Sequence, residues 1–174
     1  MLQLVETWLP IIFSLTWLHT TLSIIALLSG FVVLRDLLTS TAPDAWTTTF
    51  LVSSIATSAI GFAFFPITPI MESHVTAALS LLVLAIALIA AYGFRSTGPW
   101  RVVYAMTLVV AQFFNVLVAI ALAFRKVPQL NALAPTQKEL PFIVTGVITL
   151  TLFLVLAILA GSYYRYEPMM KKAA

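Results

Sequence analysis

The sequence contains no cysteine. That absence excludes disulfide bonds, iron–sulfur clusters, thiolate zinc sites and covalently attached c-type haem. Charge is scarce as well, because Asp, Glu, Lys and Arg make up only 9% of the residues, against roughly 25% in a soluble domain. All of these charged residues lie between the apolar segments or at their edges. The net charge of +3 is therefore expected to face lipid headgroups, and no nucleic-acid partner is indicated.

Acidic residues are missing from the interior of every apolar segment. Proton and ion relays in membranes use buried acids, so a pump is not indicated. The sequence also lacks a phosphate-binding loop, an HExxH zinc motif and a recognisable Ser–His–Asp set. These absences favour a protein that is not an enzyme.

Apolar residues, in contrast, make up 61% of the chain. Five segments approach or exceed the roughly 20 residues needed to cross a bilayer: 10–34, 47–65, 73–94, 102–124 and 141–164. The pattern predicts an all-α membrane protein, a bundle of five transmembrane helices in a single domain, residues 1–174. Segment 47–65 is short and rich in Ser and Thr, so an alternative with four spans and a re-entrant second segment stays open.

Basic residues between the segments predict the orientation. Six fall on one side: Arg35, Arg95, Arg101, Arg165, Lys171 and Lys172. Three fall on the other: Arg125, Lys126 and Lys138. The positive-inside rule then puts the N-terminus outside and the C-terminus in the cytoplasm. No basic residue precedes the first segment, which we therefore interpret as a retained helix and not a signal peptide. Aromatic residues are expected at the membrane interfaces: Trp8, Trp46, Trp100, Tyr163, Tyr164 and Tyr166.

His19 is the one ionisable side chain that lies well inside a segment of spanning length. A titratable group at membrane depth is by default a functional-site hypothesis. Small or hydroxylated residues share its helical face at spacings of three and four: Thr16, Ser23, Ala26 and Gly30. Such residues let neighbouring helices approach closely, so His19 is expected to point into the bundle.

Polar residues on other segments are candidates to meet His19: Thr57, Tyr104, Gln112 and Asn115. At 1.5 Å per residue, His19 and Asn115 lie roughly 13 and 15 Å below the outer membrane surface. The pattern predicts an outer-leaflet site for a quinone, a lipid or another small lipophile, lined by these five residues. The alternative is that His19 only packs, hydrogen-bonded to Asn115 or to a hydroxyl of segment 47–65.

The two histidines of the chain, His19 and His74, are also candidate axial ligands of a haem b. Their expected heights differ by about 10 Å, which argues against a shared iron. A metal site formed by Met71, Glu72 and His74 is not favoured, because this spacing does not put the three side chains on one helical face.

Two further features leave alternatives open. The proline-containing loop 125–141 is either a solvated connector or a segment that docks on the bundle and covers the His19 site from outside. Small residues along the last segment serve either internal packing or contacts between copies of the chain: Thr145, Thr149, Ala157 and Gly161.

Short motifs spread along the chain carry a resemblance. They are Leu18-His19, Thr57-Ser58-Ala59-Ile60-Gly61-Phe62, Phe65-Pro66, Ser73-His74-Val75, Gly98-Pro99-Trp100-Arg101, Tyr104, Asn115-Val116, Lys126-Val127-Pro128 and Leu133-Ala134-Pro135-Thr136-Gln137. With these motifs the chain resembles a family of small uncharacterised bacterial integral membrane proteins. The resemblance implies a multi-span helical fold in the bacterial inner membrane, and it implies no activity.

The sequence thus predicts a non-enzymatic integral membrane protein. It would bind a lipophilic ligand, a quinone or a lipid, or act as an accessory subunit beside other subunits of a membrane complex. The alternative is a haem b redox protein that uses His19 and His74.

Overall fold

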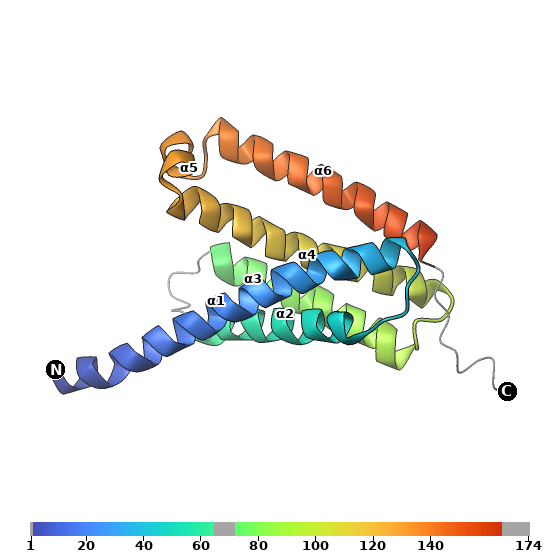
Figure 1. Cartoon of the computed structure of the whole chain (residues 1–174), viewed down its shortest axis with the longest axis horizontal. Coiled ribbons are helices and arrows are strands. Elements are labelled where there is room, and N and C mark those ends of the chain that lie inside the picture. The colour runs from blue at the N-terminus through green and yellow to red at the C-terminus, as the bar shows by residue number, and fades with distance from the viewer. Residues whose placement is uncertain (1, 65–71, 165–174) are drawn as a thin grey trace.

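The structure, a computed structural model, describes the backbone of residues 2–64 and 72–164 and the side chains of residues 14–62 and 74–164. Within these ranges the chain is helical and has no strand. Figure 1 shows the long helices aligned side by side along one axis. The elements are α1 (Leu2–Leu38), α2 (Ala45–Phe64), α3 (Glu72–Leu88), the π-helical turn η1 (Ile89–Gly93), α4 (Pro99–Lys126), α5 (Pro128–Leu133) and α6 (Leu140–Tyr163).

All five predicted helical segments are helices, and most boundaries agree within a few residues. The exception is α1, which begins at Leu2 although Pro10 suggested a later start. With 37 residues and 1.5 Å per residue, α1 is about 55 Å long, so its N-terminal part projects beyond the other helices (Figure 1). The short helix α5 lies in the loop 125–141 and was not predicted.

The bundle has two ends. The η1 end contains the end of α1, the start of α2, η1, the start of α4 and the end of α6; the α5 end contains α5 and the opposite helix ends (Figure 1). At the η1 end, the Ser40 hydroxyl donates to the carbonyl oxygen of Tyr163 at 2.6 Å. Trp46 is exposed at this end, and the Trp100 ring stacks on Phe94 with 3.8 Å between centroids. The predicted interfacial residue Tyr166 and the side chain of Trp8 lie outside the described residues.

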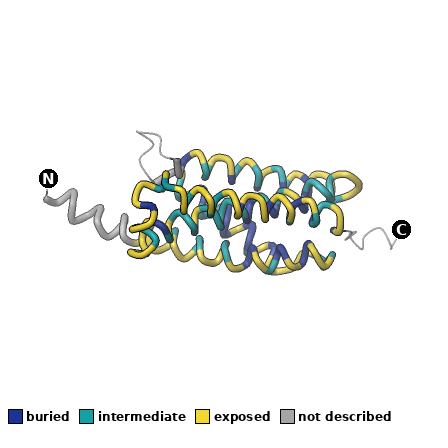
Figure 2. The backbone as a smooth tube through the Cα atoms, turned by 90° about the horizontal axis from the view of Figure 1, so that it is seen from above, coloured by how far each residue is buried: buried dark blue, intermediate teal, exposed yellow. Residues whose placement is uncertain are grey.

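Small side chains let α1 and α2 approach closely. Ala26, Ser29 and Gly30 are buried on α1, and Ser53 and Ser54 are buried on α2. Helix α4 packs against α1, α3 and α6 and so occupies the centre of the bundle. In Figure 2 the buried positions lie along the inner faces of the helices, while the outer faces are exposed.

Four helices of the described chain are long and apolar enough to cross a membrane: Ser14–Leu38, His74–Gly93, Pro99–Lys126 and Leu140–Tyr163. Their outward faces are apolar; on α6, for example, Ile148 and Ile158 are each 63% exposed. Such faces need an apolar solvent, so the structure indicates a membrane protein. Helix α2 is not among these four. It is nevertheless one continuous helix of 20 residues.

The small residues of α6 pack inside the chain. Thr149 and Ala157 are buried, and a Cβ atom added at Gly161 would lie 3.1 Å from Val102 and 3.2 Å from Met106 of α4. This stripe therefore provides close packing between α6 and α4, the first of the two alternatives.

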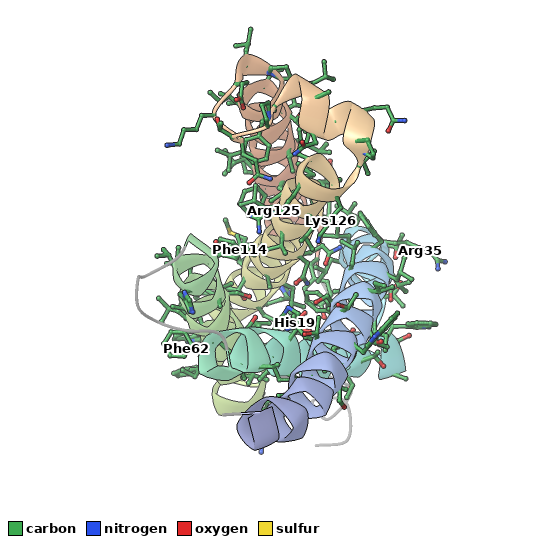
Figure 3. All side chains as sticks on the ribbon, turned by 90° about the vertical axis from the view of Figure 1, so that its left-hand side faces the viewer. His19, Arg35, Phe62, Phe114, Arg125 and Lys126 are labelled. Atoms are coloured by element: carbon green, nitrogen blue, oxygen red, sulfur yellow. The ribbon has the colours of Figure 1, made fainter. Side chains whose placement is uncertain are left out.

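The loop after α4 docks on the bundle. The Asn131 side chain donates to the carbonyl oxygen of Phe124 at 3.2 Å, the Gln137 side chain donates to that of Ala121 at 2.6 Å, and Ala134 is fully buried. However, α5 lies at the α4–α6 side of the bundle, far from α1 and α2 (Figures 1 and 3). The expectation that this loop covers His19 is therefore wrong.

Candidate functional site

Gln112 is the most deeply buried polar side chain of α4, with no exposed surface. Its amide nitrogen donates to the carbonyl oxygen of Leu27 on α1 at 2.9 Å. Gly30 lies opposite, and a Cβ atom there would overlap the Gln112 amide. The glycine on α1 is thus what admits the glutamine from α4.

Asn115 lies one turn further along α4. Its amide nitrogen donates to the Ser54 hydroxyl of α2 at 3.1 Å and to the Gln112 side-chain oxygen at 3.4 Å. The two buried amides of α4 therefore meet and connect three helices. Of the two partners that the sequence offered for His19, Asn115 is not the one found, since its amide donates to Ser54 and Gln112 instead.

His19 points toward the interior, as predicted. Figure 3 shows it on the side of α1 that faces the bundle. The ring is hydrogen-bonded to the backbone of Thr57 on α2, and its Cε1 atom would lie 3.4 Å from a Cβ atom at Gly61. Because Ser54 and Thr57 are one turn apart on α2, His19 extends the polar contacts of the two amides. We call His19, Ser54, Thr57, Gln112 and Asn115 the interior polar cluster.

Tyr104 does not belong to this cluster, and its predicted place in a site with His19 is wrong. It shares the inward face of α4 with Asn115, but about 16 Å of helix separates the two residues at 1.5 Å per residue. The Tyr104 side chain is 3% exposed, and its ring lies 6.1 Å from that of Tyr164. Helical periodicity predicted the face correctly and could not predict the neighbours.

Tyr104 instead lines a cleft of about 370 Å³ at the η1 end. We call it the η1 cleft. Its walls come from the start of α2, from η1 with the connection that follows it, from the start of α4 and from the end of α6. The lining residues are Pro43, Asp44, Thr47, Thr48, Leu51, Ala91, Tyr92, Arg95, Ser96, Tyr104 and Tyr164. A cleft of this size with a few polar groups suits a small ligand.

The backbone around the η1 cleft is unusual. The last turn of the third segment is π-helical, over Ile89–Gly93, and such turns are frequent at functional sites. Arg95 and Ser96 follow with φ values of 50° and 48°, a left-handed conformation that costs non-glycine residues of the order of 1 kcal/mol or more. The amide of Ser96 donates to the carbonyl oxygen of Ala90 at 2.8 Å and holds this turn.

The sequence did not single out the η1 cleft. A Tyr and an Arg at the end of an apolar segment are ordinary interfacial residues. The closest signal was the short connection 95–101 with its Gly98-Pro99 pair. Neither the π-helical turn nor the left-handed residues have a sequence signature strong enough to predict them.

His74 is buried, and its ring meets that of Phe62 edge-on with 6.3 Å between centroids. His19 faces Gly61, the residue before Phe62. The two imidazoles therefore lie beside the same turn of α2, so their heights are closer than the sequence predicted, and the difference in height no longer argues against a shared iron. Consecutive helical residues point about 100° apart, however, so the rings lie against different faces of α2. A shared haem iron would therefore require α2 to move.

The described residues contain no group of three or more His, Asp or Glu side chains that could hold a metal ion. Of the metal site weighed from the sequence, Met71 and the side chain of Glu72 lie outside the described residues.

Comparison with protein-family models gave no match, and neither did comparison with curated proteins or with solved structures. The assignment of function therefore depends on the geometry of this chain.

Proposed function

We propose that the chain is an integral protein of a bacterial cytoplasmic membrane and crosses it five times. At 20 residues α2 is about 30 Å long, which matches the hydrocarbon thickness, and it packs along α1. The loop before α2 and the loop before α4 both line the η1 cleft, through Asp44 and Arg95. Both loops lie on one side of the membrane only if α2 crosses, which supports five spans.

The proposed orientation has the N-terminus outside and the η1 end in the cytoplasm. Among the described residues each end of the bundle has three basic residues: Arg35, Arg95 and Arg101 at the η1 end, and Arg125, Lys126 and Lys138 at the α5 end. The excess of basic residues on one side comes from Arg165, Lys171 and Lys172. These three lie outside the described residues and follow Tyr164 of the η1 cleft in the sequence. The positive-inside rule then favours a cytoplasmic η1 end.

The function that the geometry supports best is non-enzymatic binding of an amphipathic, lipid-like ligand in the η1 cleft. The observation that supports it is the cleft itself, bounded by η1 and by the left-handed residues Arg95 and Ser96. Leu51 and Ala91 supply apolar surface, and the polar lining lies at a helix end, where a lipid headgroup would be. This moves the ligand from the predicted outer-leaflet site to the opposite leaflet.

The interior polar cluster is better explained by packing. The side-chain amides of Gln112 and Asn115 donate hydrogen bonds to the Leu27 carbonyl oxygen and the Ser54 hydroxyl, so they connect helices of the same chain. Hydrogen bonds of this kind in membranes contribute about 0.6 kcal/mol on average. This supports a packing role for the two amides.

The test is to fill the η1 cleft. Ala91→Phe places a ring inside it, and Gly146→Phe adds the same bulk on α6, where a Cβ atom meets nothing within 4 Å. Native mass spectrometry of the detergent-purified protein should show a bound lipid or quinone in the unaltered protein and in Gly146→Phe, and little or none in Ala91→Phe. Equal occupancy in Ala91→Phe and the unaltered protein would refute binding in the cleft.

A further inference from the structure

The η1 cleft has two formally charged side chains in its lining, Asp44 and Arg95. The Asp44 carboxylate already accepts hydrogen bonds within the chain. Its Oδ1 atom accepts hydrogen bonds from the backbone N–H groups of Trp46 at 2.8 Å and Thr47 at 3.2 Å. This is the N-cap arrangement, in which the carboxylate also interacts favourably with the positive end of the helix dipole. The negative charge in the cleft is therefore directed at the first turn of α2.

Arg95 is the remaining charge. Its side chain is exposed and lines the cleft, and it forms no ion pair with a carboxylate of residues 14–62 and 74–164. A guanidinium offers five N–H donors in a planar fork that matches the oxygens of a phosphate group. Arg95 and Ser96 adopt a left-handed backbone conformation that a glycine would adopt more easily.

The surroundings of Arg95 suit a phosphate with an apolar tail. The Tyr92 and Tyr104 side chains line the same cleft and carry phenolic O–H donors, whereas the Ser96 hydroxyl donates to the carbonyl oxygen of Ala90 at 3.5 Å. Leu51 and Ala91 extend the lining toward the membrane interior. The cytoplasmic leaflet, which the proposed orientation puts beside the η1 end, is the anionic one.

From this combination we infer that the η1 cleft recognises the phosphate of an anionic phospholipid headgroup, with Arg95 as the residue that pairs with it. The inference deepens the proposed function and rests on it. It commits to a lipid of the surrounding leaflet; a free phosphate ion has the same head chemistry but would leave the apolar lining unused.

The experiment compares lipids that differ in net charge. The protein is purified in detergent with equimolar phosphatidylglycerol and phosphatidylcholine, and the bound lipids are measured by native mass spectrometry. The unaltered protein should retain phosphatidylglycerol in preference. Arg95→Gln should lose about fivefold of that preference, the change that corresponds to about 1 kcal/mol for one basic residue at a membrane surface. Arg95→Lys, which keeps the charge and loses the fork, should lie between the two.

Arg35→Gln is the matched control. Arg35 lies at the same end of the bundle and points away from it (Figure 3), so the headgroup preference should be unchanged. Equal preference in Arg95→Gln and the unaltered protein would overturn the inference, and so would displacement of the lipid by inorganic phosphate. Failure of the proposed function looks different, because then Ala91→Phe would leave lipid occupancy as it is.

Discussion

At the scale of single residues, Gly30 and Gln112 depend on each other. The glutamine can reach the carbonyl oxygen of Leu27 only because position 30 has no side chain. Close backbone approach at small residues and polar contacts between helices are the two ways in which helices associate in lipid, where the hydrophobic effect gives no preference for a neighbouring helix. This one contact uses both.

Gly30→Ala should destabilise the protein by about 1–3 kcal/mol, the usual cost of an extra methyl group in a filled interior. Gly146→Ala is the matched control, because its Cβ atom meets open space and alanine is the better helix former by up to about 1 kcal/mol. Thermal unfolding in detergent should therefore show a lower midpoint for the first variant and an unchanged or higher one for the second. Two equal shifts would contradict the close contact.

A double-mutant cycle tests the same contact from the other side. Gln112→Ala removes the side chain that the new methyl group would meet, so Gly30→Ala should cost much less in that background. The coupling between the two substitutions should be about 0.5–3 kcal/mol, as for residues in direct contact. Additive effects in thermal unfolding would mean that the two residues do not touch.

At the scale of elements, the connection between α3 and α4 stands out. After the π-helical turn come three residues with positive φ: Arg95, Ser96 and Gly98. Only the last is a glycine, so Arg95 and Ser96 hold a conformation that opposes their own preference. The strain is local, and it can be measured by substitutions at Ser96 and Gly98.

Ser96→Gly should stabilise the protein by about 1 kcal/mol, because glycine adopts a φ of 48° without steric cost. Gly98→Ala should do the opposite and cost about 1–3 kcal/mol, because its φ of 53° and ψ of −130° are accessible almost only to glycine. Thermal unfolding midpoints of the two variants should move in opposite directions. A destabilised Ser96→Gly would show that the serine side chain outweighs its backbone strain.

The connection between α5 and α6 is held by a carboxylate. Glu139 accepts hydrogen bonds from the Thr136 hydroxyl at 2.8 Å and from the Lys138 backbone N–H at 3.0 Å. Desolvation raises the pKa of this carboxyl group, but the hydrogen bonds from Thr136 and Lys138 together outweigh it and leave the pKa below its ordinary value. The ionised form is therefore the one that the fold stabilises.

This predicts an acid-sensitive loop. A carboxyl group with a lowered pKa contributes stability above its ordinary pKa and loses that contribution as the pH falls through its pKa in the folded state. Glu139→Gln should therefore be slightly less stable than the unaltered protein at neutral pH, and the difference should vanish in acid. Unfolding midpoints measured across this pH range provide the check; a difference that is constant with pH would count against the role of the charge.

At the scale of the whole molecule, the two ends differ in design. The α5 end is closed by a loop whose amide side chains bind carbonyl oxygens of α4. The η1 end contains the cleft, its charge and the strained connection. Between them the outer faces of the helices are exposed (Figure 2) and carry many large apolar side chains.

The absence of cysteine makes the orientation directly testable. Single cysteines are introduced at the exposed positions Thr41, Thr97 and Gln129 and treated with a membrane-impermeant maleimide. Gln129→Cys should react in intact cells, whereas Thr41→Cys and Thr97→Cys should react only after the membrane is opened. If α2 does not cross, Thr41→Cys and Thr97→Cys will react from opposite sides.

Much of the fold could be predicted from the sequence, because the relevant physics is local. Uncharged apolar segments of sufficient length determine that the solvent is lipid and where the long helices lie. Spacings of three and four residues determined that His19, Gln112 and Asn115 face inward. The start of α1 was predicted too late because Pro10 was taken as its first residue. The helix α5 was not predicted because its six residues are too few to show a helical period.

Only the tertiary structure decided which inward-facing residues meet. Periodicity gives a residue its face, but the height at which two helices pass each other depends on the packing of all their small side chains. That is why Asn115 binds Ser54 and not His19. It is also why Tyr104 lies in the cleft at the η1 end, away from His19. The cleft itself depends on left-handed residues at Arg95 and Ser96, which their own preferences oppose and only the surrounding helices hold in place.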